Sequence, residues 1–195
     1  MKSFDEIYGR MKNLGMKVPE SRVFIKIPGA ARILEDCFRY FLSFENAVYL
    51  PQPEYTEVAE WLEDNRGRGL FMYGDCGRGK TFLANYVIPA ILLKYAGKVV
   101  FSYDIQEMNR RLDEVLNRPI IVLDDIGTEE ISVSFGNKRA AFIEIMDAAE
   151  KYGKLMIVTT NLDGDRIADR YGPRALERII STTKRVEFKG KSLRK

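Results

Sequence analysis

Eight consecutive residues have the spacing of a phosphate-binding loop. They fit the pattern GxxxxGK[ST] and are Gly74, Asp75, Cys76, Gly77, Arg78, Gly79, Lys80 and Thr81. Glycines let the backbone curl so that successive N–H groups point at phosphate oxygens, and the N-terminus of a following helix adds partial positive charge. Lys80 is expected to reach the β- and γ-phosphates, and the Thr81 hydroxyl to hold Mg²⁺. The spacing therefore predicts binding of ATP with Mg²⁺.

Two carboxylates follow the third strand of the predicted sheet. Ile120–Leu123 is an all-apolar run, and Asp124 and Asp125 come directly after it. At the carboxyl end of a parallel strand, such side chains face the same crevice as the phosphate loop. We expect Asp124 to bind Mg²⁺ through water and Asp125 to position or deprotonate the attacking water. The alternative is a pair of aspartates in an ordinary turn.

A further apolar run also has a polar end. Leu155–Val158 precedes Thr159, Thr160 and Asn161. The Asn161 amide is able to orient a water molecule or to contact the γ-phosphate, and on this pattern alone it equally fits an asparagine that caps a helix or a turn.

Strand and helix patterns alternate around these motifs. The expected strands cover residues 23–27, 70–73, 99–103, 120–123, 155–158 and 185–188, and the expected helices cover 4–14, 31–44, 54–65, 81–95, 104–117, 137–152, 163–170 and 173–181. Pro89 is expected to kink or split the helix over 81–95, because it removes one hydrogen bond. The alternation predicts an α/β fold, a three-layer α/β/α sandwich with a parallel sheet.

Composition narrows the class of protein. The chain has 195 residues, which suits one domain with a modest extension, and a net charge of +3, which is weak evidence for nucleic-acid binding. Histidine is absent, so histidine catalysis and ligation are excluded, and the two cysteines are too far apart for a CxxC motif. An apolar leader and a membrane-length apolar run are also missing, so we expect a cytoplasmic protein without membrane contact.

The motifs taken in order resemble those of AAA+ ATPases, and more closely those of the DnaC/DnaI/IstB group. The resemblance lies over about 69–195 and is carried by residues 69–81, 120–130, 157–162, 170–179 and 186–194. It implies an AAA+ core over 53–195 without a C-terminal helical lid domain, preceded by a mostly helical extension over 1–52. The chain departs from many AAA+ proteins in having Asp-Asp, rather than Asp-Glu, at the acidic strand.

The resemblance also implies roles for individual residues. Asn161 matches the sensor-1 position, and Arg178 matches the arginine finger that acts on ATP bound to a neighbouring subunit. Such a finger implies self-association through ATP-bridged interfaces. Arg194 matches a sensor-2-like arginine that contacts ATP. In the alternative, Arg178 is solvated or pairs with Glu177 or Asp169.

The resemblance to helicase loaders of this group implies a hypothesis about function. The chain would be an ATPase that docks on a replicative hexameric helicase, through residues 1–52, and aids its placement on single-stranded DNA. Arg110 and Arg111 would then contact DNA together with the basic segment 184–195, although they also fit a solvated helix face. Two other hypotheses remain open: an IstB-like regulator of transposition acting on duplex DNA, and an adaptor in which nucleotide binding is purely structural.

Overall fold

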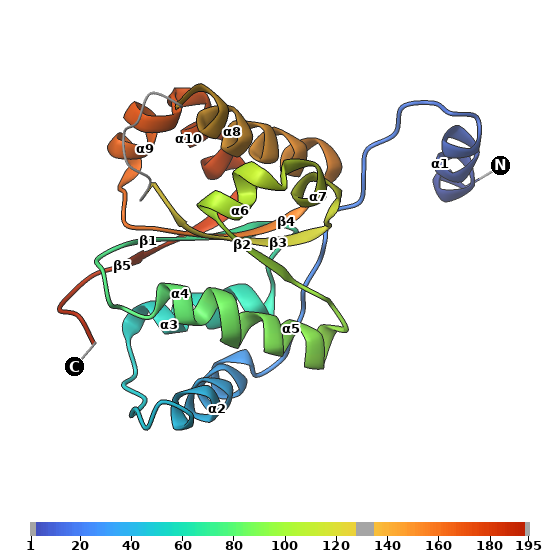
Figure 1. Cartoon of the computed structure of the whole chain (residues 1–195). Helices are drawn as coiled ribbons and strands as arrows, with labels where there is room; N and C mark the ends of the chain where they lie inside the picture. The colour runs from blue at the N-terminus through green and yellow to red at the C-terminus, as the bar shows by residue number, and fades with distance from the viewer. Residues whose placement is uncertain (1–2, 128–134, 194–195) are drawn as a thin grey trace.

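A five-stranded parallel sheet lies at the centre of the molecule (Figure 1). The computed structural model describes residues 3–127 and 135–193, and only the backbone of 135–140. The strand order is β2-β3-β4-β1-β5, and every neighbouring pair is parallel. The strands are β1 (Gly69–Gly74), β2 (Phe101–Asp104), β3 (Ile120–Ile126), β4 (Leu155–Thr160) and β5 (Thr183–Phe188). This order places β4, with its polar end, between the strands that carry the phosphate loop and the carboxylates.

Helices cover both faces of the sheet (Figure 1). One layer holds α2 (Ala30–Ser43), α3 (Pro53–Glu63), α4 (Lys80–Phe82), the π-helical turn η1 (Leu83–Val87) and α5 (Ile88–Ala96). The other holds α6 (Ile105–Arg110), α7 (Leu112–Asn117), α8 (Phe135–Tyr152), α9 (Gly164–Tyr171) and α10 (Pro173–Thr182). The predicted three-layer α/β/α fold is confirmed.

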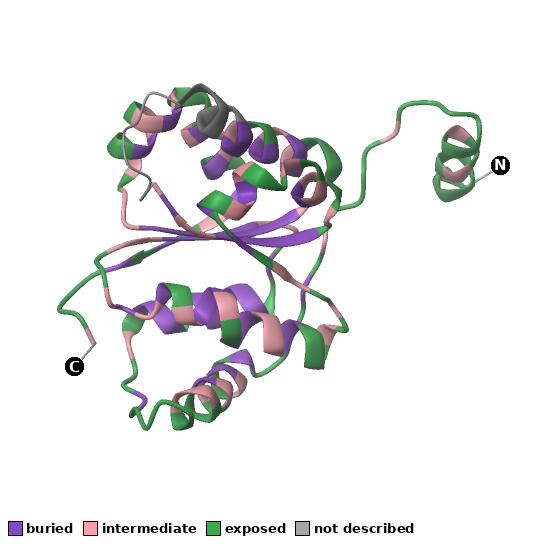
Figure 2. Cartoon of the chain, viewed as in Figure 1, coloured by how far each residue is buried: buried purple, intermediate pink, exposed green. Residues whose placement is uncertain are grey.

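The three central strands β1, β3 and β4 are buried on both faces because their side chains alternate between two apolar cores (Figure 2). Leu70 and Met72 of β1 join the core under α2, α3 and α5, whereas Phe71 joins the core under α6 to α10. Successive side chains of a strand point to opposite faces. A sheet packed in this way holds the carboxyl ends of β1, β3 and β4 in fixed relation to one another.

Two of the predicted helices are divided in the structure. The helix expected over 104–117 is split into α6 and α7 at Arg111. The helix expected over 81–95 is split into α4, η1 and α5, with Pro89 in the first turn of α5. The predicted interruption at Pro89 is therefore confirmed.

The strand predicted over 23–27 is wrong. Ile25 and Ile27 are buried, but their backbone hydrogen bonds go to the end of α3 and the loop after it. The N–H of Ile25 donates to the Asn65 side chain at 2.8 Å, and the N–H of Ile27 donates to the Leu62 carbonyl at 3.1 Å. Apolar alternation indicated burial correctly, but the hydrogen-bond partners are not a strand.

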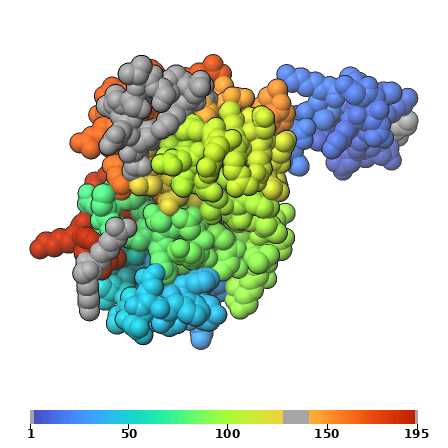
Figure 3. All heavy atoms as spheres, viewed as in Figure 1, coloured from blue at the N-terminus to red at the C-terminus, as the bar shows by residue number. Residues whose placement is uncertain are grey.

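The N-terminal helix α1 (Phe4–Asn13) differs from α2 in its packing. It has no buried residue and projects from the body (Figures 1 and 3). By contrast, α2 places Ala30, Leu34 and Phe38 in the core beside the sheet. Within the described residues, no helix combines the length and apolar character needed to cross a membrane.

Asn65 is expected to be a strong determinant of stability. It is 2% exposed, accepts hydrogen bonds from the N–H groups of Ile25 and Gly67, and donates to the carbonyls of Val23 and Arg68. Asn65→Ala leaves buried backbone groups unpaired, so we expect a loss of about 2–4 kcal/mol in urea unfolding. The exposed Asn13→Ala is the control and should change the free energy of unfolding by less than about 0.5 kcal/mol. Equal effects of the two variants would contradict this role.

Candidate nucleotide site

The phosphate loop connects β1 to α4 through backbone conformations that require glycine. Gly79 has φ of 90° and directly precedes Lys80, the first residue of α4. A Cβ atom at Gly79 would lie 2.8 Å from the Tyr55 hydroxyl oxygen, and one at Gly74 would collide with the Phe188 carbonyl. The loop therefore packs closely against Tyr55 and Phe188, which leaves no room for a side chain at either glycine. Its backbone leads into a helix N-terminus, whose first N–H groups have no intrahelical partners and favour an anion.

The Lys80 ammonium joins the loop to the end of β4. Lys80 is 6% exposed, and its Nζ donates to the carbonyls of Gly74 and Asp75 at 2.9 and 2.7 Å. It also donates to Asn161 Oδ1 at 2.9 Å. A buried charge needs such partners. The structure therefore brings together two residues predicted to act on the phosphates, 81 positions apart in sequence.

The Asp124 carboxylate lies beside Thr81 and is held on both oxygens. Thr81 Oγ1 and Thr159 Oγ1 donate to its Oδ1 at 3.1 and 2.6 Å, and Asn85 Nδ2 donates to its Oδ2 at 2.8 Å. Hydroxyl and carboxylate oxygens are the ligands that Mg²⁺ prefers, and the ion usually retains several waters. Asn85 Oδ1 is buried and has no hydrogen-bond partner among the described residues, and a buried acceptor of this kind is commonly satisfied by water or a bound ion. The donor set therefore fits a hydrated Mg²⁺.

Asp125 sits in a strained turn at the end of β3. Its φ is +54°, and the register between β3 and β4 shifts between Leu123 and Ile126. Its N–H donates to Thr159 Oγ1 at 2.8 Å, and Asn161 Nδ2 donates to its Oδ1 at 3.1 Å. Residues held at positive φ store strain and are found preferentially at functional sites. The bulge turns the Asp125 carboxylate toward Asn161, so the two strand ends predicted to act together do lie together.

The Arg78 side chain points away from the phosphate position. Its guanidinium forms an ion pair with Glu54 at 2.5 Å and donates to Gln52 Oε1 at 2.6 Å, and the side chains of Arg78 and Glu54 are each 6% exposed. The Tyr55 hydroxyl donates to the Arg78 carbonyl at 3.1 Å, and burial raises the pKa of Tyr55 to about 12, so this donor stays protonated. Arg78 can therefore contact phosphate only through its backbone, because its side chain anchors the loop to α3.

Arg178 is paired with carboxylates of α8, outside the Lys80 network. Its Nε donates to Asp147 Oδ1 at 3.1 Å, its guanidinium also pairs with Glu150, and Arg174 bonds the other Asp147 oxygen at 2.8 Å. The carboxylates are not Glu177 or Asp169, the partners considered from sequence. The packing of α10 on α8 supplies Asp147 and Glu150 instead.

The remaining predicted contact residues lie apart from this network. Arg110 and Arg111 are exposed at the junction of α6 and α7, and Arg111 pairs with Glu114 at 2.6 Å. In the basic segment, Lys184 bonds Glu60 at 2.9 Å. Arg194 lies outside the described residues.

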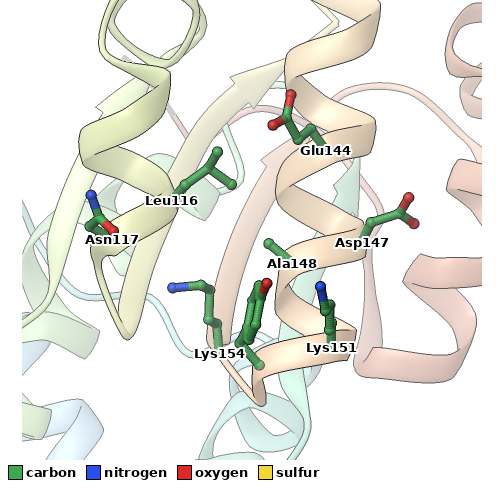
Figure 4. A pocket seen from close by; sticks show the side chains of 8 residues that line it. Leu116, Asn117, Glu144, Asp147, Ala148, Lys151 and Lys154 are labelled. Carbon is green, nitrogen blue, oxygen red and sulfur yellow. The ribbon is translucent and has the colours of Figure 1, made fainter.

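A cavity of about 570 Å³ lies between α7 and α8, away from the phosphate loop (Figure 4). It is lined by Leu116, Asn117, Glu144, Asp147, Ala148, Lys151, Tyr152 and Lys154. Tyr152 and Lys154 precede the first residue of β4, so the cavity opens at the amino edge of the sheet, whereas the loop lies at the carboxyl edge. Burial lowers the pKa of Lys154, whose Nζ already donates to the Arg118 carbonyl. The cavity is lined by both carboxylates and amines, so its lining indicates no single class of ligand.

Comparison with known proteins decides the family of the chain. Residues 49–182 match the family model of Novel STAND NTPase 3, nSTAND3, which covers the phosphate loop and both polar strand ends. The chain belongs to the nSTAND3 family of NTPases. The chain also resembles the replicative helicase loader DnaI of Bacillus subtilis (strain 168), with 31% identity over 93 residues. That match covers 40% of this chain and 30% of DnaI, so the chain spans under a third of that relative.

Solved structures show how widely the fold of this nSTAND3 protein is shared. The DnaC helicase loader has a TM-score of 0.64 at 22% identity, covering 77% of this chain and 99% of that one. DnaI has a TM-score of 0.62 at 20% identity, covering 87% and 96%. DnaA from Aquifex aeolicus, bound to AMPPCP, has a TM-score of 0.55 at 21% identity over 74% and 49%. The predicted resemblance to the DnaC and DnaI group of AAA+ folds is confirmed.

The Arg78–Glu54 pair gives a test of how the loop is anchored. Glu54→Ala strands a buried guanidinium, so we expect a loss of about 3–5 kcal/mol in the free energy of unfolding. Glu35→Ala is the matched control, because it breaks an exposed pair with Arg39, and it should cost under about 1 kcal/mol. Urea unfolding followed by tryptophan fluorescence measures both, and similar losses would contradict a loop anchored by this pair.

Proposed function

We propose that the chain is an ATPase that works as a helicase loader in DNA replication. The observation that carries the proposal is the network that joins Lys80 of the phosphate loop to Asn161 and, through it, to Asp125. It unites at the carboxyl edge of the sheet a phosphate-binding cation, a carboxylate able to act on water and an amide beside both. Membership of an NTPase family and similarity to DnaI support the proposal.

Each residue of the site has a role that follows from its position. The loop N–H groups and Lys80 hold the phosphates of ATP, and Thr81 and Asp124 hold Mg²⁺, which when bound neutralises negative charge on the β- and γ-phosphates. Asp125 accepts a hydrogen bond from the attacking water and polarises it. Asn161 keeps the Asp125 carboxylate oriented, because its amide already donates to that group.

The loader role assigns the outer surfaces of the molecule to partners. Helix α1 offers exposed apolar side chains, Phe4 at 91% and Tyr8 at 40%, and is the part of residues 1–52 proposed to dock on a replicative hexameric helicase. Arg110 and Arg111 are proposed to contact the phosphates of single-stranded DNA. Arg178 is proposed to act on ATP in a neighbouring copy of the chain, once assembly draws it from Asp147 and Glu150. Arg194 remains a proposed ATP contact from sequence alone.

Native mass spectrometry of the chain mixed with the replicative helicase of its own genome tests the loader role. With ATP and Mg²⁺, we expect a defined complex with a helicase hexamer, and removal of residues 1–22 should abolish it. Absence of the complex, with assembly of the chain on duplex DNA instead, would contradict the loader role and favour a regulator of transposition.

Lys80→Ala is expected to weaken ATP binding at least 100-fold, since it removes the cation proposed to bind the phosphates. Isothermal titration calorimetry measures the dissociation constant, and circular dichroism checks that the variant is folded. Lys17→Ala, an exposed lysine outside the network, is the control and should bind as the wild type does. Retained affinity in folded Lys80→Ala would refute the phosphate loop.

Arg178→Ala is expected to leave ATP binding unchanged and to lower the hydrolysis stimulated by assembly at least 10-fold. Phosphate release measured over a range of protein concentrations separates stimulated from basal turnover. Arg166→Ala, an exposed arginine of α9, is the control. Unchanged stimulation in Arg178→Ala would exclude Arg178 as the finger and turn attention to Arg174.

A further inference from the structure

Pro89 interrupts the helix after the phosphate loop at a defined residue. In a regular α-helix, the N–H of residue 89 would bond to the carbonyl of residue 85. Proline has no N–H, and its ring collides with that same carbonyl. In the structure, Leu83–Val87 widens into a π turn, in which the N–H of Ile88 donates to the Leu83 carbonyl, and α5 restarts with Pro89 in its first turn. The residue whose carbonyl must give way to the ring is Asn85.

Asn85 lies in that π turn and contacts the carboxylate proposed to bind Mg²⁺. Its Nδ2 donates to Asp124 Oδ2 at 2.8 Å. It follows Thr81 by four residues, and both side chains reach the same carboxylate from one side of the helix. Single π turns inside α-helices occur frequently at functional sites.

The three hydrogen bonds to Asp124 leave its carboxylate a single orientation. Thr81 and Thr159 donate hydrogen bonds to Oδ1. Among the described residues, Asn85 donates to Oδ2, and this hydrogen bond prevents rotation about the Cβ–Cγ bond. Asn85 Oδ1 is itself buried and has no hydrogen-bond partner among the described residues.

We propose that Asn85 is a positioning residue for the metal-binding carboxylate of Asp124, and that Pro89 sets its position through the π turn. The proposal rests on the proposed ATP and Mg²⁺ site, and adds to it a residue outside the phosphate loop and the strand ends. Residues that hold a metal ligand in place change metal affinity by about 10- to 100-fold when they are removed.

Binding of a fluorescent ATP analogue to the full-length chain, titrated with Mg²⁺, tests the proposal without measuring turnover. Asn85→Ala is expected to bind the analogue in EDTA within about twofold of the wild type and to need at least 10-fold more Mg²⁺ for the half-maximal gain in affinity. Asn109→Ala is the matched control. Its Oδ1 is likewise buried and unpartnered among the described residues, but its Nδ2 donates to the Ile105 carbonyl, away from the site. It should respond to Mg²⁺ as the wild type does.

Pro89→Ala tests the π turn while leaving Asn85 in the chain. Without the ring, the helix is free to close into regular α geometry and to draw Asn85 from Asp124, so we expect at least a fivefold rise in the Mg²⁺ requirement without loss of stability to urea. A wild-type Mg²⁺ response in Pro89→Ala would overturn the role of Pro89.

The outcomes separate this proposal from the function on which it rests. A wild-type chain that gains no affinity from Mg²⁺ would overturn the proposed site and this proposal with it. A wild-type chain that gains affinity, with an unchanged Mg²⁺ requirement in folded Asn85→Ala, would overturn the positioning role alone.

Discussion

A buried ammonium group organises the centre of this protein. Lys80 is almost completely removed from water, and a cation in that position is tolerated only where oxygens surround it. Two of those oxygens are carbonyls of the loop that carries it, and another belongs to Asn161 at the end of β4. The charge therefore requires the loop to curl and the two strands β1 and β4 to be neighbours. The parallel sheet, covered by helices on both faces, places β1 and β4 side by side.

The carboxylates at the end of β3 are controlled by hydrogen bonds and by a backbone bulge. Asp124 and Asp125 are adjacent in sequence, yet Asp124 is directed to Thr81 and Asp125 to Asn161. The positive φ of Asp125 makes this divergence possible. Thr159 holds both residues, because its hydroxyl donates to Asp124 and accepts from the N–H of Asp125. Two neighbouring acids can therefore have separate tasks, one toward a metal ion and one toward water.

Local patterns in the sequence predicted most of the fold. Buried runs such as Ile120–Leu123 have no polar alternation, which is typical of a strand covered on both faces. The segment 23–27 was assigned wrongly because alternation reports burial, whereas the partner of its backbone is the side chain of Asn65, 40 residues away. Pro89 predicted an interruption of its helix, but only the structure shows that the interruption takes the form of a π turn over Leu83–Val87.

The candidate site was predictable only where a motif contains the residue. The loop pattern named Arg78 without indicating that its side chain turns back to Glu54, because the pattern constrains the backbone alone. Asn85 belongs to no motif, and Thr159 lies in the 157–162 motif without an assigned role, so only the meeting of distant segments shows that they hold Asp124. A polar residue one turn beyond Thr81 on an otherwise apolar helix was the available signal for Asn85.

A crystal structure with a non-hydrolysable ATP analogue and Mg²⁺ tests the central claim most directly. The account predicts phosphates cradled by the loop with Lys80 Nζ on their oxygens, and a metal ion beside Thr81 and Asp124. Nucleotide bound at another surface, or bound at the loop with Lys80 still turned to the Gly74 and Asp75 carbonyls, would contradict it.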